Sequence, residues 1–441
     1  MRKVVLVYSG GLDTSVCIPL MREEYGFEHV ITVTVDVGQA REDIAQAEER
    51  ARRLGTEHYT VDARTLFVER FCWPAVRANG DYQGYPISTS IARPLIALKA
   101  VEKAQELGAN AFGHGCTGKG NDQFRIEYIM RTLMPNAEIV APMREGRKMP
   151  DGSREPWTRT EEIEYANAHG VEISQTASKI WSIDENLWGR SVEGGRLEEP
   201  DFAPPEEIFQ WTRGLADTPN EPRLLAIGFE NGVPTTLDSQ QYSPYELVVE
   251  LNKIAGENGI GRLDIMEDRM LGLKVRENYE CPAAVTILTA HRALEALVCT
   301  QCELKFKSSV DKEWGELAYK GLWFDPLKED LEAFINKVQE RVTGTVFMRL
   351  AKGNAIVIGR QSPFALYSED LASFDSKTFN QAESLGIVKT HGMQSKLYFQ
   401  LKYPEGTLLA GGMERKLLGS STVAGEQKDA GAAGATGDYS G

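Results

Sequence analysis

The seven residues from Ser9 to Ser15, SGGLDTS, have the composition of a loop that binds phosphate. The glycine pair lets the backbone turn sharply and approach a ligand, and the last three residues are candidate N-caps for a following helix, expected to run to about Tyr25. The apolar run Val4–Val7 predicts a buried strand before the loop. A strand, a turn and a helix N-terminus together direct backbone N–H groups and the positive end of a helix dipole at one point, which suits phosphate. A purely structural glycine turn is the alternative for this stretch alone.

A second stretch, HGCTGKGNDQFR, has side chains suited to a charged and polar ligand, and it ends at Arg125. Glycines lie on both sides of Thr117 and Lys119, and Asn121 and Asp122 are expected to cap the helix that carries Arg125. A flexible loop that groups hydroxyl, amide and charged side chains can bind a zwitterion.

Both stretches follow apolar runs that alternate with helical patterns. This alternation predicts an α/β fold with a parallel, doubly wound sheet, in which ligands bind at the carboxyl edge of the strands. The other expected strands are His29–Val37, His58–Val61, Ala109–Gly115 and Glu138–Ala141, and the expected helices are Arg41–Leu54, Pro94–Leu107 and Thr160–His169. The polar stretch between Arg144 and Arg159 is expected to be a loop. This nucleotide-binding domain is predicted to span residues 1–171.

The second half has an α+β pattern. Asn231-Gly232 between two apolar runs predicts a type I′ hairpin, and Ser243–Glu246 is a capping box. Further expectations are one helix over Ala284–Glu303, a helix over Leu327–Val342 and a hairpin over Thr345–Gly359. We predict an α+β domain at residues 172–385 and a disordered, Gly/Ala/Ser-rich tail at residues 418–441.

Composition limits the class of protein. The 441 residues allow two or three domains, and 64 Asp and Glu against 49 Lys and Arg give a net charge of −15. An acidic chain argues against nucleic acid as the main partner. We find no signal peptide and no apolar run of ~18 residues, so the prediction is a cytoplasmic protein with no membrane span. Cys299 and Cys302 form an isolated CxxC, which predicts no metal site.

The loop SGGLDTS resembles that of the N-type ATP pyrophosphatases, which cleave ATP between the α and β phosphates. Across residues 3–398 the chain resembles one family of this superfamily, the argininosuccinate synthases. The motifs that carry the resemblance are YSGGLDTS (Tyr8–Ser15), TSIARP (Thr89–Pro94), HGCTGKGNDQFR (His114–Arg125), GIGRLDIMEDR (Gly259–Arg269) and YKGLW (Tyr319–Trp323). The chain departs from the family pattern in the loop 84–90, which is one residue shorter, in the CPAA run at 281–284, which replaces TPGG, and at Pro19 in the first helix.

The resemblance implies an ATP-dependent ligase of arginine biosynthesis. Such an enzyme condenses L-citrulline with L-aspartate through a citrullyl-adenylate and releases argininosuccinate, AMP and diphosphate. The implied cofactors are ATP and the Mg²⁺ that accompanies it. The implied assembly is a homotetramer with a C-terminal oligomerisation segment, residues 386–417.

The resemblance also assigns residues to three subsites, and it names no catalytic acid or base. The implied ATP subsite consists of Val7, Tyr8, Ser9, Gly10, Gly11, Leu12, Asp13, Thr14, Ser15, Val35 and Gly115. The implied aspartate subsite consists of Thr117, Asn121 and Asp122. The implied citrulline subsite consists of Tyr85, Ser90, Asn121, Arg125, Ser182, Ser191, Glu267 and Tyr279.

Alternatives remain for two residues and for the function. Asp122 has the alternative roles of helix N-cap and Mg²⁺ ligand, and Glu267 that of a surface ion pair with Arg262 or Arg269. The alternative functions are another ATP pyrophosphatase, such as a tRNA thiolase or an amidotransferase subunit, and a non-catalytic nucleotide sensor. The sequence has no paired catalytic cysteine or N-terminal nucleophile for the first, and a sensor has no need of a second polar pocket.

Overall fold

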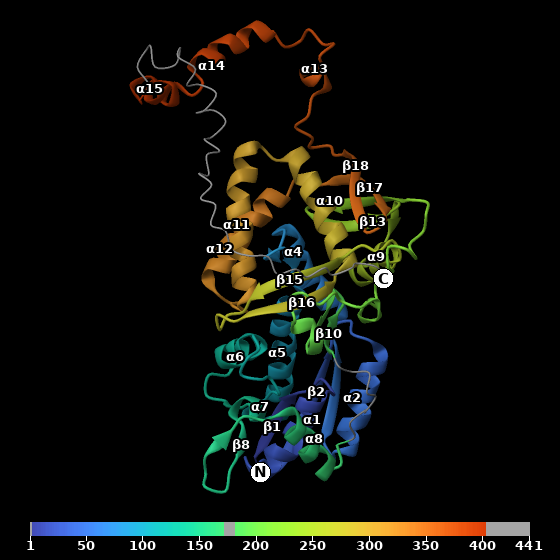
Figure 1. The fold of residues 1–441 in the computed structure, drawn as a ribbon, viewed down its shortest axis with the longest axis vertical. Helices are drawn as coiled ribbons and strands as arrows, with labels where there is room; N and C mark the ends of the chain where they lie inside the picture. Colours follow the sequence, from blue (N-terminus) through green and yellow to red (C-terminus); the bar gives the residue numbers. More distant parts are fainter. Residues whose placement is uncertain (1, 172–180, 403–441) are drawn as a thin grey trace, which may run out of the picture. The chain divides into compact units, whose positions relative to one another are not determined.

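The computed structural model describes residues 2–171 and 181–402 (Figure 1). The chain divides into two compact units, 1–366 and 367–441. The predicted tail, 418–441, and residues 403–417 of the predicted oligomerisation segment lie outside the described residues. The boundary predicted at residue 171 lies inside the first unit and stays a prediction.

Five parallel strands form the N-terminal sheet, in the order β3-β2-β1-β6-β7. They are β1 (Lys3–Val7), β2 (His29–Asp36), β3 (Glu57–Asp62), β6 (Ala111–Gly113) and β7 (Glu138–Val140). Successive residues of β1 point to opposite faces. Val5 joins the core on the side of α5 (Ser88–Leu107), and Val4 and Leu6 join the core on the side of α1 (Leu12–Glu23) and α2 (Arg41–Arg53). Helices therefore cover both faces, and the predicted doubly wound sheet is confirmed.

The strand order reverses between β1 and β6. In open α/β sheets the loops that follow two such strands border a crevice where ligands bind. These loops are the two glycine-rich stretches, which begin at Tyr8 and at His114. The sheet therefore brings the two candidate loops to one edge.

Two helix starts were predicted wrongly. Helix α5 begins at Ser88 and contains Pro94, which had been expected to open it. Ile91 and Leu95 are completely buried, so packing outweighs the backbone hydrogen bond that proline removes. In α1 the N-cap residue is Gly11, so the expected N-caps at 13–15 lie inside the first turn instead.

The helix predicted over 284–303 is two helices, α10 (Pro282–Val298) and α11 (Gln301–Tyr319). Thr300 and Glu303 form a capping box, in which the Thr300 N–H donates to Glu303 Oε2 at 2.8 Å and the Glu303 N–H donates to Thr300 Oγ1 at 3.3 Å. The T-x-x-E signal for this break is present in the sequence. Cys299 is buried beside the break and Cys302 is exposed.

A four-stranded antiparallel sheet has the order β10-β11-β16-β15. Its strands are β10 (Ser182–Asn186), β11 (Gly189–Glu193), β15 (Arg262–Asp268) and β16 (Lys274–Glu280). The register pairs Asp184 with Ser191 and Ser191 with Tyr279, and residues opposite each other share a face. One face carries Ser182, Asp184, Ser191, Glu193, Glu267, Glu277 and Tyr279, and the other carries Arg190, Asp264, Arg276 and Glu280.

A second antiparallel sheet has the order β14-β13-β12-β17-β18. Its strands are β12 (Arg223–Glu230), β13 (Val233–Leu237), β14 (Gln240–Gln241), β17 (Gly344–Ala351) and β18 (Asn354–Gln361). The hairpin predicted at Asn231-Gly232 is confirmed, with φ of 48° and 79° as a type I′ turn requires. The capping box at Ser243 is confirmed at the start of α9 (Pro244–Glu257).

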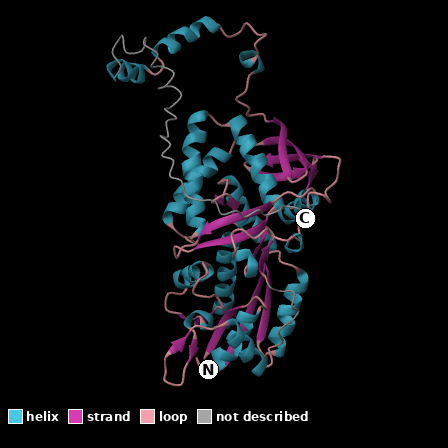
Figure 2. Cartoon of the chain, in the orientation of Figure 1, coloured by secondary structure: helices cyan, strands magenta, loops and turns pink. Residues whose placement is uncertain are grey.

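The remaining α-helices and strands of the first unit are drawn with the others in Figure 2. The helices are α3 (Arg64–Phe67), α4 (Trp73–Arg77), α6 (Asp122–Leu133), α7 (Pro142–Glu145), α8 (Arg159–Ala168) and α12 (Pro326–Gln339). The strands are β4 (Asp81–Tyr82), β5 (Tyr85–Pro86), β8 (Arg147–Lys148) and β9 (Arg154–Glu155). The stretch predicted as a loop between Arg144 and Arg159 thus contains the short β8–β9 hairpin.

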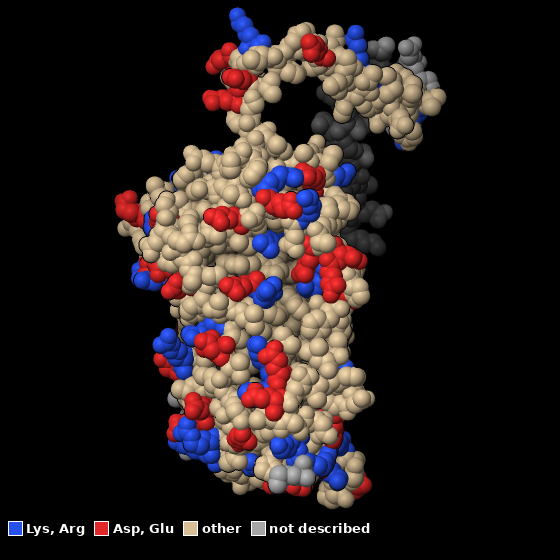
Figure 3. Space-filling view, turned by 180° about the vertical axis from the view of Figure 1, so that it is seen from behind, with Lys and Arg blue, Asp and Glu red and all other residues tan. Residues whose placement is uncertain are grey.

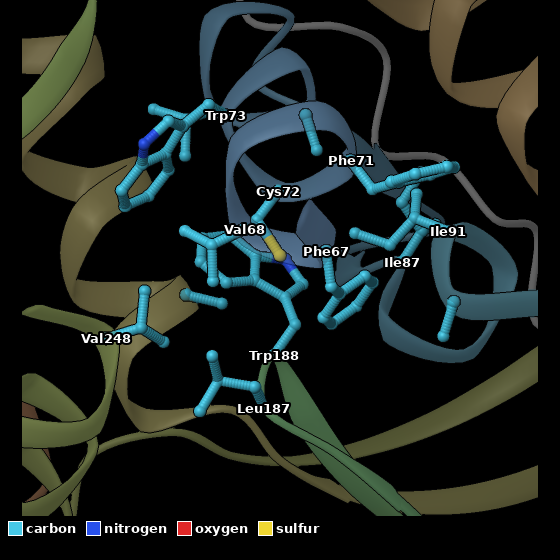
Figure 4. Close-up of a cluster of buried hydrophobic side chains, with 14 of the residues drawn as sticks. Phe67, Val68, Phe71, Cys72, Trp73, Ile87, Ile91, Leu187, Trp188 and Val248 are labelled. Atoms are coloured by element: carbon cyan, nitrogen blue, oxygen red, sulfur yellow. The ribbon is translucent and has the colours of Figure 1, made fainter. Parts of the chain in front are cut away.

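One core joins the parallel sheet to the antiparallel sheet β10-β11-β16-β15. Figure 4 shows Trp188, from the turn between β10 and β11, close to Phe67 and Val68 in the buried cluster. Beside it the Leu187 N–H donates to the Val37 carbonyl at 3.0 Å. A Cβ atom on Gly38 would lie 2.6 Å from Leu187 Cβ, so this approach requires glycine. The turn of the β10–β11 hairpin is thus fixed at the carboxyl end of β2.

Acidic and basic side chains are interspersed on the face drawn in Figure 3. Within the described ranges, no helix combines the length and the apolar composition that crossing a membrane requires. The second unit contains α13 (Glu369–Ala372), α14 (Ser384–Thr390) and α15 (Met393–Lys402). Its apolar side chains are widely exposed, including Phe374 at 97%, Ile387 at 73% and Leu401 at 82%.

Candidate functional site

The loop after β1 is held in a tight, ordered turn. Gly10 has φ of 76°, and a Cβ atom there would lie 2.6 Å from Ala47 Cβ on α2, so packing as well as conformation requires glycine. Arg50 donates to the Gly10 carbonyl. The Ser9 hydroxyl accepts from the Gly11 N–H at 3.2 Å and lies 3.1 Å from the Thr14 hydroxyl. The exposed Ser9 and Gly11 leave polar groups of the turn open to a ligand.

Other residues predicted for the ATP subsite are buried or half-buried and pack beside the loop. Tyr8 is buried, and its hydroxyl lies 2.9 Å from Ser15 Oγ, while burial raises the pKa of Tyr8. Val35 has its side chain in the core and its carbonyl accepts from Gln39 Nε2 at 2.9 Å, so only its remaining backbone groups can face a nucleotide. Leu12 and Val7 are half-buried beside the turn.

An acidic pair lies where α1 meets α8. Arg159 NH1 contacts Asp13 Oδ1 at 3.1 Å and Glu162 Oε2 at 3.0 Å. Burial and the neighbouring Asp13 raise the pKa of Glu162 to about 7. Asp13 is therefore already engaged with α8 at the edge of the phosphate loop.

The two glycine-rich loops are in direct contact. A Cβ atom on Gly115 would lie 2.9 Å from Thr14 Cγ2 and 3.0 Å from the Thr14 backbone nitrogen. The second loop can approach the start of α1 this closely only because residue 115 has no side chain. Gly115 is therefore a point at which the spacing of the two loops can be tested.

Replacing Gly115 with alanine is expected to raise the KM for ATP roughly tenfold, because overpacking against backbone costs about 1–3 kcal/mol. The matched control is Gly118→Ala in the same loop, where the added Cβ would meet only Arg144 Cγ at 3.6 Å. Steady-state kinetics with ATP varied should separate the two variants. Equal KM values for both would mean that the Gly115–Thr14 approach does not affect the nucleotide.

Two arginines neutralise Asp122. Asp122 Oδ2 accepts from Arg93 Nε at 2.7 Å, and Oδ1 accepts from Arg125 NH1 at 2.9 Å. Burial by itself would raise the pKa of Asp122, but the two guanidinium groups outweigh it and hold that pKa below its ordinary value. Asp122 is the first residue inside α6, so its interpretation as an N-cap is wrong.

Arg93 also reaches the antiparallel sheet. Its NH2 contacts Asp184 Oδ1 at 2.8 Å, and Asp184 Oδ2 accepts from the Thr89 hydroxyl at 2.6 Å. Thr89 and Arg93 stand in the TSIARP motif, yet neither was predicted to lie in a subsite. They connect α5 to the first residue of α6 and to β10.

Asn121 joins the predicted aspartate and citrulline residues. Its side chain forms no cap on α6. Instead, Asn121 Oδ1 accepts from the Met270 N–H at 3.0 Å, and Nδ2 donates to the Tyr319 hydroxyl at 2.8 Å. The Tyr319 hydroxyl donates to Glu267 Oε1 at 2.5 Å. An uninterrupted chain of hydrogen bonds therefore runs from the second glycine-rich loop to β15.

Arg125 is fixed by the end of α11. Its Nε donates to the Tyr319 carbonyl at 2.8 Å, and its guanidinium lies 4.9 Å from the centre of the Tyr319 ring. Thr117 lies exposed in the glycine-rich loop before α6. The YKGLW motif contains Tyr319, so a signal for this residue was present, but its contacts are with residues distant in sequence.

The predicted citrulline residues of the antiparallel sheet share one face. Tyr279 stacks on Tyr85 with ring centres 4.2 Å apart, and Ser191 lies opposite Tyr279 in the register. Ser182 stands on the same face and is exposed. Ser90, from α5, is buried and its hydroxyl has no hydrogen-bond partner among the described residues. An unpartnered buried hydroxyl is available to a polar ligand.

Glu267 is buried, with 3% of its surface exposed. It accepts from the Tyr279 hydroxyl at 2.8 Å in addition to Tyr319. The alternative of a surface ion pair is wrong, because Arg262 pairs with Glu206 and Arg269 pairs with Glu193 and Glu277.

Sequence reasoning missed two carboxylates on this face, Glu193 and Glu277. Arg269 NH2 lies 2.6 Å from Glu193 Oε2 and 2.8 Å from Glu277 Oε1. Burial, Glu193 and Glu267 together raise the pKa of Glu277 to about 8. No motif contains either residue, and only their period-two spacing with Ser191 and Tyr279 indicates that they share the face.

These groups can bind two ammonium-bearing ligands beside a phosphate. Carboxylates and tyrosine hydroxyls accept from ammonium groups, and the first glycine-rich loop offers N–H groups and hydroxyls to an anion. A sheet edge with both functions is that of a ligase that activates an amino acid with a nucleotide.

Comparison with known proteins makes this class specific. The model for the arginosuccinate synthase N-terminal HUP domain matches residues 3–172, and the model for the arginosuccinate synthase C-terminal domain matches residues 181–398. The argininosuccinate synthase of Methanosarcina barkeri is 55% identical over 397 residues, which are 90% of this chain and 98% of the relative. That of Methanocaldococcus jannaschii is 55% identical over 398 residues, with the same shares, and that of Methanothermobacter thermautotrophicus is 50% identical over 397 residues, which are 90% of this chain and 96% of the relative. The chain belongs to the argininosuccinate synthase family.

The enzyme is a carbon–nitrogen ligase of arginine biosynthesis. It uses ATP to condense L-citrulline with L-aspartate through a citrullyl-adenylate, and the products are argininosuccinate, AMP and diphosphate. The alternatives of a tRNA thiolase, an amidotransferase subunit and a nucleotide sensor are thereby excluded.

Proposed function

We propose that three adjoining subsites carry out this ligation. Residues 7–15 with Val35 and Gly115 bind ATP. Aspartate is bound by Thr117, Asn121 and Asp122, and citrulline by the tyrosine- and carboxylate-lined face of the antiparallel sheet. The observation that carries the proposal is the chain from Asn121 through the Tyr319 hydroxyl to Glu267, which joins both amino-acid subsites beside the nucleotide loops.

Positioning is the main task of the first step. The ureido oxygen of citrulline is a weak nucleophile, so its attack on the α-phosphorus depends on alignment and on neutralised charge more than on a base. Stacked Tyr85 and Tyr279 form an apolar wall for the side chain, and Glu267 accepts from the α-ammonium group. The loop at Ser9 and Gly11 binds the departing diphosphate.

The Mg²⁺ proposed to accompany ATP has few ligands in the protein. Among the described residues, no three His, Cys, Asp or Glu side chains are grouped to hold a metal ion. Such a site fits Mg²⁺ that is bound mostly by phosphate and water, with Asp13 as the carboxylate within the loop. The ion would supply positive charge to the triphosphate.

In the second step the α-amino group of aspartate displaces AMP. We propose that Asp122 accepts from the ammonium form of this group and that Thr117 and Asn121 orient it. Arg93 and Arg125 each occupy one oxygen of Asp122, which fixes the direction of its remaining lone pairs.

Replacing Glu267 with glutamine tests the citrulline subsite. A hydrogen bond to a charged group contributes about 1.5–3 kcal/mol, so the KM for citrulline is expected to rise at least roughly tenfold. The matched control is Asp264→Asn on the opposite face of β15, where Asp264 pairs with Arg276. Steady-state kinetics with citrulline varied should show a raised KM for citrulline in Glu267→Gln and an unchanged KM in Asp264→Asn. An unchanged KM in Glu267→Gln would remove Glu267 from the subsite.

We further propose a cytoplasmic homotetramer with a domain boundary at residue 171. The boundary is supported by the family matches, which end at 172 and resume at 181.

Assembly through residues 386–417 is supported by the exposed Ile387, Val388, Leu397 and Leu401. Sedimentation of the full chain and of a chain ending at residue 385 tests the assembly, and the same number of chains per particle in both would contradict it.

A further inference from the structure

One tyrosine hydroxyl faces two carboxyl groups in the citrulline subsite. The Tyr279 hydroxyl lies 2.8 Å from Glu267 Oε2 and 2.9 Å from Glu277 Oε2. Both distances are those of hydrogen bonds. A tyrosine hydroxyl has only one proton to donate, and ionised carboxylates only accept. One of the two contacts therefore needs another proton.

The donors that contact the other oxygens of the two carboxyl groups do not supply that proton. The other oxygen of Glu267, Oε1, accepts from Tyr319, and the other oxygen of Glu277, Oε1, accepts from Arg269. Both Oε2 atoms thus face the single hydroxyl of Tyr279. The contacts are all satisfied when one carboxyl group is protonated and donates to the tyrosine oxygen, while the tyrosine donates to the other.

We propose that Glu267, Tyr279 and Glu277 hold one proton beyond that of the tyrosine, and that the α-ammonium group of citrulline displaces it on binding. The proposal rests on the proposed binding of that ammonium group at Glu267. Glu277 is then a positioning residue, because it acts on citrulline through Tyr279 and Glu267.

The charges around Glu277 favour it as the protonated member. Glu193 from β11 and Glu267 from β15 face it, and the cation that contacts it, Arg269, also pairs with Glu193. Tyr85 from β5 and Tyr279 of its own strand are the titratable hydroxyls nearby, and Arg125 from α6 faces Glu267. The pKa of Glu277, raised to about 8 by burial and the two glutamates, is consistent with a neutral carboxyl group at pH 7.

The exchange balances in protons and charge. In the free enzyme, Glu277 donates to Tyr279 and Tyr279 donates to Glu267. When the ammonium group donates to Glu267, the O–H bond of Glu277 breaks and its proton passes to solvent. The hydroxyl of Tyr279 then donates to the new carboxylate of Glu277. One positive charge enters the subsite and one proton leaves it.

This exchange makes citrulline affinity depend on pH. Below the pKa of the protonated carboxyl group, citrulline competes with a bound proton, so its Kd falls roughly tenfold for each unit that the pH rises. The fall ends near the pKa, at about pH 8. Loss of the carboxyl group at position 277 is expected to abolish this dependence.

Calorimetric titration of the full-length enzyme with citrulline tests the proposal. At pH 7, titrations in two buffers of different ionisation enthalpy should give close to one proton released per citrulline bound. The Glu277→Gln variant should bind citrulline with no proton release and with a Kd that is constant from pH 6.5 to 8, because glutamine donates to Tyr279 permanently. Binding by the wild-type enzyme without proton release would overturn the proposal.

Two further variants show which carboxyl group holds the proton and whether Glu267 binds citrulline. Glu193→Gln removes one negative neighbour without touching Tyr279, so proton release should persist with its midpoint at lower pH. Release lost in Glu193→Gln and kept in Glu277→Gln would place the proton on Glu193 and overturn the proposal. Glu267→Gln tests the underlying subsite: citrulline bound as tightly as by the wild type would reject the subsite, whereas weakened binding with no wild-type release would reject only the proton exchange.

An infrared difference spectrum of the wild-type enzyme does not depend on any variant folding. The carbonyl band of a protonated carboxyl group should be present at pH 7 and disappear when citrulline is added. A spectrum without such a change would also overturn the proposal.

Discussion

Replacing Asp122 with asparagine is expected to leave adenylate formation intact and to slow its capture by aspartate at least tenfold. Asparagine keeps the size of the side chain but removes the charge that accepts from the ammonium group of aspartate, a contact of about 1.5–3 kcal/mol. It also leaves Arg93 and Arg125 without their shared carboxylate, so two cations would face the incoming ammonium group. The two effects act in the same direction.

Rapid-quench measurements can separate the two steps. Diphosphate released in a single turnover from ATP and citrulline reports the first step, and argininosuccinate formed after aspartate is added reports the second. Glu267→Gln serves as the reciprocal control, since it should impair the first step. If diphosphate release collapses in a folded Asp122→Asn enzyme, Asp122 acts in adenylation, as the Mg²⁺-ligand alternative requires.

The second large expected effect is on stability. It concerns an ion pair of the antiparallel sheet β10-β11-β16-β15, on the face opposite the citrulline subsite. Glu280 and Arg190 are each 1% exposed and pair at 2.9 Å. Glu280 also accepts from the backbone N–H groups of Gln210, Trp211 and Thr212, at 2.9–3.0 Å. Replacing Glu280 with alanine is expected to lower the free energy of unfolding by about 3–5 kcal/mol, because the buried Arg190 loses its nearer carboxylate, with only Glu185 left at 3.4 Å, and three backbone donors lose their acceptor.

Chemical denaturation measures this loss. The matched control is Glu206→Ala, which removes an exposed partner of Arg262, 73% accessible, and should cost at most about 1 kcal/mol. Equal losses for the two variants would mean that water enters and solvates Arg190 when Glu280 is removed.

Local signals predicted local structure well. The β-branched run before Ser9, the Asn231-Gly232 turn and the capping box at Ser243 each depend on residues within a few positions of one another, and each is confirmed. Pro94 was predicted wrongly because burial of its helix outweighs a local preference. The break at Thr300 was missed although its capping box is equally local, because the apolar pattern continues across it.

In the candidate site, too, local sequence signals predicted some residues, while contacts between distant residues were missed. Short motifs located both glycine-rich loops and Glu267, since each motif is contiguous in sequence. Asn121 and Tyr319 are 198 residues apart, so their contact depends on the packing of α11 against α6. Glu277 was missed for a related reason, because its importance comes from the register of β16 with β11 and β15.

The last residue of α11 has a consequence for substrate range. Tyr319 contacts the second glycine-rich loop through Asn121, α6 through Arg125 and β15 through Glu267. On the proposed placement, the gap between the two amino acids is therefore determined by a helix end and not by the nucleotide loops. An enzyme engineered to join a longer or shorter acceptor to citrulline would need changes at Tyr319 and at the C-terminus of α11 first. The loops proposed to bind ATP could then remain unchanged.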